Sequence, residues 1–146
     1  PCGTGKTFVS FLLSLDYKNI FIMTPLISTT EQILEHYKNY YSSYKDVNYI
    51  CVNCNGERNI DNIKLNNNKN IIASTYDSSD VIWKLLKDTD IEDNLVIVDE
   101  FHNLSDDVYD KLENYVNYIY KIHNKKTKNK RGFFRKRKCS WVCLSG

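Results

Sequence analysis

The sequence has 146 residues, of which 42% are hydrophobic and 26% charged, a composition that is typical of one globular domain and excludes a disordered chain. The net charge of +2 is unevenly distributed, because residues 121–138 carry ten Lys or Arg and no acid, whereas the remaining residues have a net charge of −8. No apolar run approaches the ~18 residues of a membrane span, no secretory leader is expected, and five irregularly spaced cysteines favour a reducing, intracellular compartment, cytoplasmic or nuclear.

Apolar runs without polar alternation predict a series of buried strands. In chain order these runs are residues 19–24, 48–52, 70–74, 95–98 and 140–144. Segments with helical spacing of apolar residues lie between them, at residues 6–13, 28–43, 78–88 and 105–122. Ser28 or Thr29 is the expected N-cap of the second helix, and Ser105 that of the last. Residues 53–70, with eight asparagines, predict a polar loop with one irregular helical turn around residues 60–65.

The alternation of strands and helices defines the expected fold. Strands that read as continuous apolar runs are buried on both faces, which is typical of a parallel sheet covered by helices on both sides. We therefore predict a one-domain α/β fold with right-handed crossovers. The basic segment 121–138 is predicted to be a solvated loop far from the carboxyl ends of the strands, since the preceding helix carries the chain away from them. An auxiliary phosphate contact or a nuclear address is the alternative for this segment.

Residues Gly3, Thr4, Gly5, Lys6 and Thr7 match the end of the P-loop pattern GxxxxGK[ST]. The glycines allow backbone N–H groups to turn toward a phosphate, and a helix beginning at Lys6 would direct its positive end at that anion. Lys6 would place a charge on the β- and γ-phosphates, while the Thr7 hydroxyl would coordinate Mg²⁺. The first glycine of the pattern would precede the given sequence, which is expected to be truncated before the P-loop strand. A glycine-rich turn before a surface helix is the alternative.

The apolar run 95–98 is followed directly by Asp99 and Glu100, which is the Walker B arrangement. Ligands bind at the carboxyl ends of the strands in open α/β sheets. Asp99 could hold Mg²⁺, and Glu100 could orient and deprotonate an attacking water. An acidic strand end that caps the next helix is the alternative, but the combination with the glycine-rich loop indicates a nucleoside triphosphate site.

These motifs together resemble the first motor domain of a superfamily 2 helicase or translocase, in the branch near type III restriction-enzyme helicase subunits. The matching segments, in the family's order, are motif I at 1–7, motif Ia at 24–25 with Gln32, an S-T-Y-x-S segment at 74–78, a DExH motif II at 99–102, and the start of motif III at 144–146. The resemblance implies a partial RecA-like P-loop NTPase domain over residues 1–146. A second RecA-like domain in cis, with the arginine finger, would lie outside the sequence.

The resemblance also implies a role for each matching residue. Gly3, Thr4, Gly5, Lys6 and Thr7 would bind ATP, and Thr7 and Asp99 would hold Mg²⁺. Lys6, Asp99 and Glu100 would act in hydrolysis, and His102 and Ser145 would couple hydrolysis to nucleic-acid binding. Pro25, Ser28 and Thr75 would contact the nucleic-acid backbone, with DNA favoured over RNA. The third residue of motif III is missing, so the assignment of Ser145 rests on Ser145 and Gly146 alone.

We therefore expect an ATP-dependent nucleic-acid helicase or translocase that hydrolyses ATP in the intact protein, whereas the chain alone is expected to be inactive. A P-loop ATPase that remodels protein complexes is one alternative, and a non-catalytic nucleotide-binding module is another. The presence of both Lys6 and Glu100 argues against the non-catalytic module.

Four cysteines could be read as zinc ligands, namely Cys51, Cys54, Cys139 and Cys143. Two of them fall inside predicted strands, where cysteine acts as a small buried apolar residue, so no zinc is expected. Asn, Lys, Ile and Tyr make up 58 residues, which favours an AT-rich genome such as that of a large virus and weakens any argument from Asn or Lys abundance.

Overall fold

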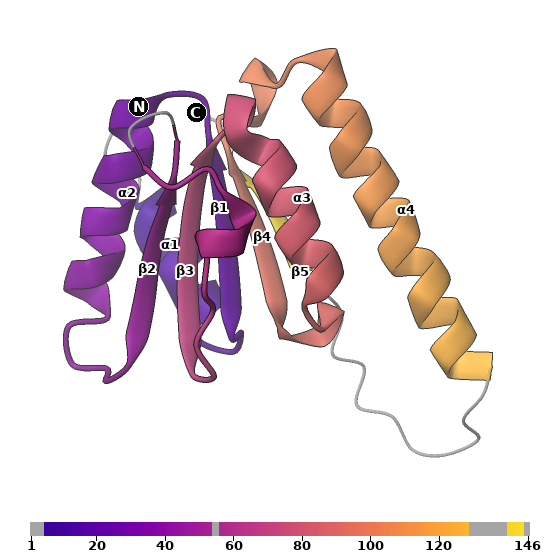
Figure 1. Ribbon diagram of the computed structural model, residues 1–146, viewed down its shortest axis with the longest axis horizontal. Coiled ribbons are helices and arrows are strands. Elements are labelled where there is room, and N and C mark those ends of the chain that lie inside the picture. The colour runs from indigo at the N-terminus through magenta and orange to yellow at the C-terminus, as the bar shows by residue number, and fades with distance from the viewer. Residues whose placement is uncertain (1–4, 54–55, 129–139, 145–146) are drawn as a thin grey trace.

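The computed structural model describes residues 5–53, 56–128 and 140–144, and these residues form five strands and four α-helices (Figure 1). The strands are β1 (Asn19–Thr24), β2 (Val47–Val52), β3 (Lys69–Thr75), β4 (Asn94–Asp99) and β5 (Ser140–Leu144). The α-helices are α1 (Lys6–Ser14), α2 (Ile27–Tyr40), α3 (Ser79–Asp88) and α4 (Asp106–Lys128). Four short 3₁₀ turns complete the described elements: η1 (Ile60–Asn62), η2 (Tyr76–Ser78), η3 (Ile91–Asp93) and η4 (Phe101–Asn103).

The described strands form one sheet in the order β2-β3-β1-β4-β5, and every neighbouring pair is parallel. The predicted α/β fold with a parallel sheet is therefore confirmed. Strand β1 lies between β3 and β4, so its last residue, Thr24, lies beside Thr75 at the end of β3. Asp99 ends β4 at the same edge of the sheet, which is the upper edge in Figure 1. The predicted site residues on these strands are thus brought to one edge.

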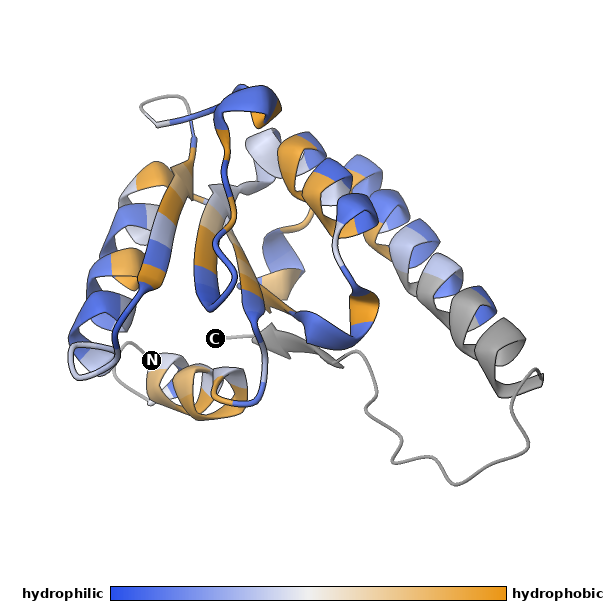
Figure 2. Ribbon diagram, turned by 60° about the horizontal axis from the view of Figure 1, so that its bottom comes forward, coloured by the Kyte–Doolittle hydropathy of each residue, from blue (hydrophilic) through white to orange (hydrophobic). Residues whose placement is uncertain are grey.

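Alternate residues of β1 enter two different cores. Ile20 and Ile22 belong to a core shared with α2, whereas Phe21 and Met23 belong to a core shared with α3 and α4. Helices α1 and α2 accordingly cover one face of the sheet, and α3 and α4 cover the other (Figures 1 and 2). Continuous apolar runs therefore predicted this sandwich correctly, because a strand covered on both faces has no polar side.

Helix α2 begins earlier than the sequence predicted. It starts at Ile27 with Leu26 in the N-cap position, so the expected caps Ser28 and Thr29 lie inside its first turn, and that prediction is wrong. No side chain caps this helix. The Leu26 carbonyl instead accepts hydrogen bonds from the backbone N–H of Thr30 at 3.0 Å and from its hydroxyl at 2.9 Å.

Helix α4 continues to Lys128, so the prediction of a loop over 121–138 is wrong for residues 121–128. Those eight residues contain neither Gly nor Pro, and lysine is a good helix former whose charge is favourable near a helix C-terminus. Residues 129–138 lie outside the described part of the chain. Figure 1 shows α4 leading away from the edge that carries Asp99, in the expected direction. The ring of Tyr115 on α4 lies 5.7 Å from the ring of Trp83 on α3.

Helix α1 is attached to the domain by polar contacts and by the packing of Phe11 against the tyrosines of α2. Its Ser10 hydroxyl lies 2.8 Å from that of Tyr37, and its Ser14 hydroxyl lies 2.5 Å from that of Tyr41. Lys69 on β3 also donates to the Ser14 carbonyl at 2.9 Å. On the outer side, four apolar side chains of the helix are exposed, Phe8, Val9, Leu12 and Leu13, and Figure 2 shows α1 as a largely hydrophobic ribbon. The hydroxyl pairs therefore hold the later part of α1 against the end of α2.

A row of asparagine side chains crosses the opposite edge of the sheet, where the strands begin. Asn48 donates to Asn70 at 3.1 Å, Asn70 donates to Asn19 at 2.8 Å, and Asn19 donates to Asn94 at 3.0 Å. These residues occupy matching register positions on β2, β3, β1 and β4. Both the NH₂ and the oxygen of the Asn70 side chain make two hydrogen bonds, since the side chain also donates to the Asn66 carbonyl and accepts from the Asn66 N–H. The row satisfies polar groups that burial would otherwise leave unpaired.

We expect Asn70→Ala to lower the free energy of unfolding by about 2–4 kcal/mol, because the buried Asn19 and the partly buried Asn66 would lose hydrogen-bond partners. Urea denaturation of the chain measures this change. Asn67→Ala is the matched control, since Asn67 is exposed in the same loop and its replacement should change stability by less than about 0.5 kcal/mol. Equal stability of the two variants would show that the asparagine row does not stabilise the sheet.

Candidate active site

The first turn of α1 and the end of β4 face each other at the upper edge of the sheet. Gly5 is the N-cap of α1 and has a φ of 76°, a left-handed conformation that favours glycine. Its carbonyl accepts the N–H of Val9 at 2.9 Å, which closes the first helical turn. Lys6 and Thr7 are the first two residues of the helix, so both lie where its unpaired N–H groups attract an anion. The predicted residues Gly3 and Thr4 lie outside the described part of the chain.

The side chains of Lys6, from the first turn of α1, and Glu100, just after β4, contact each other. Lys6 Nζ lies 3.3 Å from Glu100 Oε1, and the two side chains are 28% and 30% exposed. His102 Nε2 lies 3.4 Å from the other carboxylate oxygen of Glu100, and its side chain is 56% exposed. The sequence separates Lys6 from Glu100 by 94 positions, so the fold brings together the residues of the two phosphate motifs.

The backbone at Glu100 has an unusual conformation. Its φ of 52° and ψ of 50° lie in the left-handed region, which a residue with a side chain adopts at a cost of about 1–3 kcal/mol. The Glu100 N–H donates to Asp99 Oδ1 at 3.1 Å, and the Glu100 carbonyl accepts the N–H of Asn103 at 2.8 Å. Hydrogen bonds of both the N–H and the carbonyl of Glu100 thus hold the turn after β4 in place.

Asp99 is half-buried beside this turn. Partial burial raises the pKa of its carboxyl group, the negative charge of Glu100 raises it further, and Lys6 acts in the opposite direction. A divalent cation next to Asp99 would relieve this destabilisation of the ionised form. The site combines an ammonium group, a hydroxyl at a helix N-terminus and two carboxylates, a donor set that fits a triphosphate with Mg²⁺.

A groove of about 660 Å³ adjoins this site at the same edge of the sheet. It brings together Pro25, Ser28 and Thr75, the three residues that the family resemblance assigned to nucleic-acid contact. The remaining lining residues are Leu26, Ile27, Glu31, Arg58, Asp77 and Ser78. Hydroxyl groups and the first turn of α2 therefore face the groove, together with one cation and two carboxylates.

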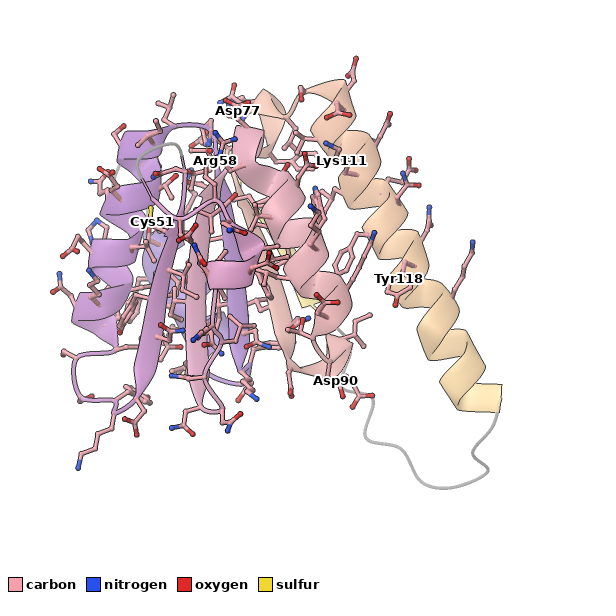
Figure 3. All side chains as sticks on the ribbon, in the orientation of Figure 1. Cys51, Arg58, Asp77, Asp90, Lys111 and Tyr118 are labelled. Carbon is pink, nitrogen blue, oxygen red and sulfur yellow. The ribbon has the colours of Figure 1, made fainter. Side chains whose placement is uncertain are left out.

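Arg58 is a lining residue that the sequence analysis missed. It follows a turn after β2, in which the N–H of Gly56 donates to the Asn53 carbonyl at 3.2 Å and that of Glu57 to the Cys51 carbonyl at 3.1 Å. Figure 3 shows Arg58 near Asp77 at the upper edge of the sheet. It forms no ion pair with any residue that the structure describes. Its side chain is exposed and lines the groove.

Some of the remaining predicted residues lie outside the described part of the chain. Ser145 lies outside the described residues, and so do Cys54 and Cys139. Cys51 lies on β2, where its sulfur accepts a hydrogen bond from the Asn53 side chain at 3.0 Å. Within the described ranges there is no cluster of three His, Cys, Asp or Glu suited to a metal ion, and no helix long and apolar enough to span a membrane.

A parallel α/β sheet with a lysine at a helix N-terminus and an Asp-Glu pair at its carboxyl edge is the arrangement expected of a P-loop nucleotide-binding domain. Over residues 1–125 the chain matches the family model described as "Type III restriction enzyme, res subunit", and it belongs to this family.

The fold also matches the solved structure of a nuclease-deletion mutant of the Type ISP restriction-modification enzyme LlaGI in complex with a DNA substrate mimic. The TM-score is 0.53 at 23% sequence identity, and the match covers 68% of this chain and 10% of that chain. The chain thus spans about a tenth of the length of this structural relative.

Proposed function

We propose that this chain is the nucleotide-binding part of an ATP-dependent nucleic-acid helicase or translocase. The observation that supports this most strongly is the 3.3 Å contact between Lys6 and Glu100, which joins the two phosphate motifs in one site. Membership of the type III restriction-enzyme res subunit family supports the same activity. In the full-length protein we expect this domain to pair with a second RecA-like domain in cis, so that the chain alone is inactive.

Each residue of the site has a distinct chemical task in this proposal. Lys6 neutralises the terminal phosphates, and Thr7 and Asp99 supply oxygen ligands for Mg²⁺. Glu100 holds and deprotonates the attacking water, since its carboxylate is partly exposed and close to Lys6. Bound Mg²⁺ would supply positive charge to the phosphates during hydrolysis. His102 contacts the second oxygen of Glu100, a position from which it can transmit changes to that carboxylate.

The groove beside the site is proposed to bind the nucleic-acid backbone. Ser28 and Thr75 offer hydroxyl donors, and Arg58 offers a charge for a phosphate oxygen. Binding of DNA is favoured over RNA, because the structural relative was solved with a DNA substrate mimic. A P-loop ATPase that remodels proteins remains the second candidate, because Glu31 and Asp77 give the same groove a partly acidic lining.

Stimulation of ATP hydrolysis separates these two candidates. Phosphate release by the full-length protein is measured with no polymer, with single- and double-stranded DNA, and with RNA of matched length. The proposal expects nucleic acid to raise turnover, with DNA the stronger activator. Turnover that no nucleic acid changes would favour the protein-remodelling ATPase.

We expect Arg58→Gln to weaken nucleic-acid binding about three- to tenfold, because one charged phosphate contact is lost. The slope of log K against log[salt] should become shallower by ~0.7–0.9, which fluorescence titrations at several salt concentrations measure.

Two other variants serve as controls for Arg58. Glu31→Gln removes a carboxylate from the same lining and should strengthen binding. Lys45→Gln makes the same charge change as Arg58→Gln in an exposed loop just before β2 and should leave affinity within about twofold. If Arg58→Gln and Lys45→Gln behave alike, the groove does not bind phosphate.

A further inference from the structure

Tyr76 connects the groove to the turn that carries Glu100. It directly follows Thr75 at the end of β3, and its ring is 7% exposed within the core under α3 and α4. Its hydroxyl donates to the backbone carbonyl of Asp99 and lies 3.2 Å from that of Glu100. Because β1 lies between β3 and β4, the Tyr76 side chain reaches past the end of β1 to the end of β4.

The Glu100 backbone needs this kind of support. A left-handed conformation at a residue with a side chain persists only where neighbouring groups hold it. The contacts of the Glu100 N–H with Asp99 and of its carbonyl with Asn103 come from residues within the same turn. The Tyr76 hydroxyl, in contrast, comes from a segment 24 positions earlier in the chain. It is therefore a contact with the backbone of this turn through which another part of the fold can act on it.

The segment around Tyr76 is also one wall of the groove. Thr75, Asp77 and Ser78, on both sides of Tyr76 in the chain, line the groove, and the Thr75 hydroxyl donates to that of Ser78 at 3.3 Å. A ligand that binds to these side chains will restrain or displace the backbone that carries Tyr76. The Tyr76 hydroxyl would move with it, because the ring is packed in the core and cannot turn freely.

We propose that Tyr76 is a positioning residue that transmits occupancy of the groove to Glu100. The proposal rests on the proposed function, since it assumes that nucleic acid binds in the groove and that Glu100 activates water. Tyr76 touches neither ligand. It sets the backbone geometry that directs the Glu100 carboxylate toward Lys6, so its loss should affect the chemical step more than the binding of either ligand.

The test is Tyr76→Phe in the full-length protein, which removes the hydroxyl and keeps the buried ring. We expect the nucleic-acid-stimulated kcat to fall about tenfold, which is the size of effect that the loss of one hydrogen bond produces. The KM for ATP and the affinity for DNA should stay within about twofold of the wild type, because neither ligand contacts Tyr76. The ratio of stimulated to basal turnover should therefore fall.

Tyr41→Phe is the matched control. Tyr41 is also buried, and its hydroxyl also makes hydrogen bonds, to Ser14 and Lys69, but on the other face of the sheet. The two variants should have similar melting temperatures, while only Tyr76→Phe should lose stimulation.

Three outcomes would contradict the role of Tyr76. The first is a stimulated kcat within about twofold of the wild type, and the second is an equal fall of basal and stimulated turnover, which indicates a merely structural role. The third is equal loss of stimulation in Tyr41→Phe. In each of these cases, stimulation of the wild-type enzyme by nucleic acid would still support the proposed function. A wild-type enzyme without any stimulation would overturn the proposed function, and the role of Tyr76 with it.

Discussion

Replacement of Lys6 by alanine is expected to reduce ATP hydrolysis by the full-length protein about 10³-fold or more. Lys6 is held at the N-terminus of α1, and its ammonium group lies 3.3 Å from the Glu100 carboxylate. In the proposed complex the Lys6 ammonium group contacts the terminal phosphates in place of Glu100. The neutral N–H groups of the loop cannot replace its full charge. Steady-state phosphate release at saturating ATP and DNA measures the effect.

Lys38→Ala is the control for this variant. Lys38 is an exposed lysine near the end of α2, paired with Glu35 at 2.9 Å, and an exposed pair of this kind contributes little to stability. Its replacement should leave hydrolysis unchanged. Near-normal turnover in Lys6→Ala would contradict the P-loop assignment, whereas a similar loss in both variants would point to general damage to the protein.

The features that could be predicted from the sequence are those encoded in short stretches. The continuous apolar runs 19–24 and 95–98 identify strands covered on both faces, and the parallel sheet follows from their alternation with helices. The phosphate motifs are also local, and both fall at strand or helix ends. Since the carboxyl ends of parallel strands share one edge, Pro25 and Thr75 could be expected near each other before any contact was known.

Other features depend on register and side-chain direction, which short patterns do not encode. The asparagines of the row across the sheet are indistinguishable in the sequence from those of the polar loop, and an AT-rich composition obscures both. Only the strand register shows that Asn19, Asn70 and Asn94 stand side by side. Arg58 and Tyr76 were missed for the same reason: Arg58 lines a groove with residues distant in the sequence, and Tyr76 hydrogen-bonds to the turn after β4.

Helix ends were the least predictable features. A Ser or Thr near the start of an amphipathic segment suggests an N-cap, yet α2 begins at Ile27, before both candidates. Charge also misled the prediction for α4, since a run of lysines that reads as a solvated loop can continue an exposed helix. In both cases the residue types near the helix terminus are a weak signal for the residue at which the helix begins or ends.

Glu100→Gln is expected to separate nucleotide binding from hydrolysis. The amide has nearly the size of the carboxylate and can still accept a hydrogen bond from Lys6, but it cannot take a proton from water. Turnover should fall about 10²–10⁴-fold, the usual contribution of a general base. ATP affinity should be equal or higher, because a negative charge near the phosphates is removed.

Equilibrium binding of labelled ATP and single-turnover hydrolysis measure the two effects of this variant separately. Glu113→Gln, on an exposed position of α4, makes the same change in charge away from the site and should alter neither. The variant keeps the demand on the left-handed turn unchanged, because glutamine must adopt the same backbone conformation at position 100. If ATP binding falls as far as hydrolysis does, Glu100 serves to hold Lys6 and the first turn of α1 in place, and the base lies elsewhere. If binding persists while hydrolysis stops, the negative charge of Glu100 is dispensable for nucleotide binding, and the carboxylate is needed for the water.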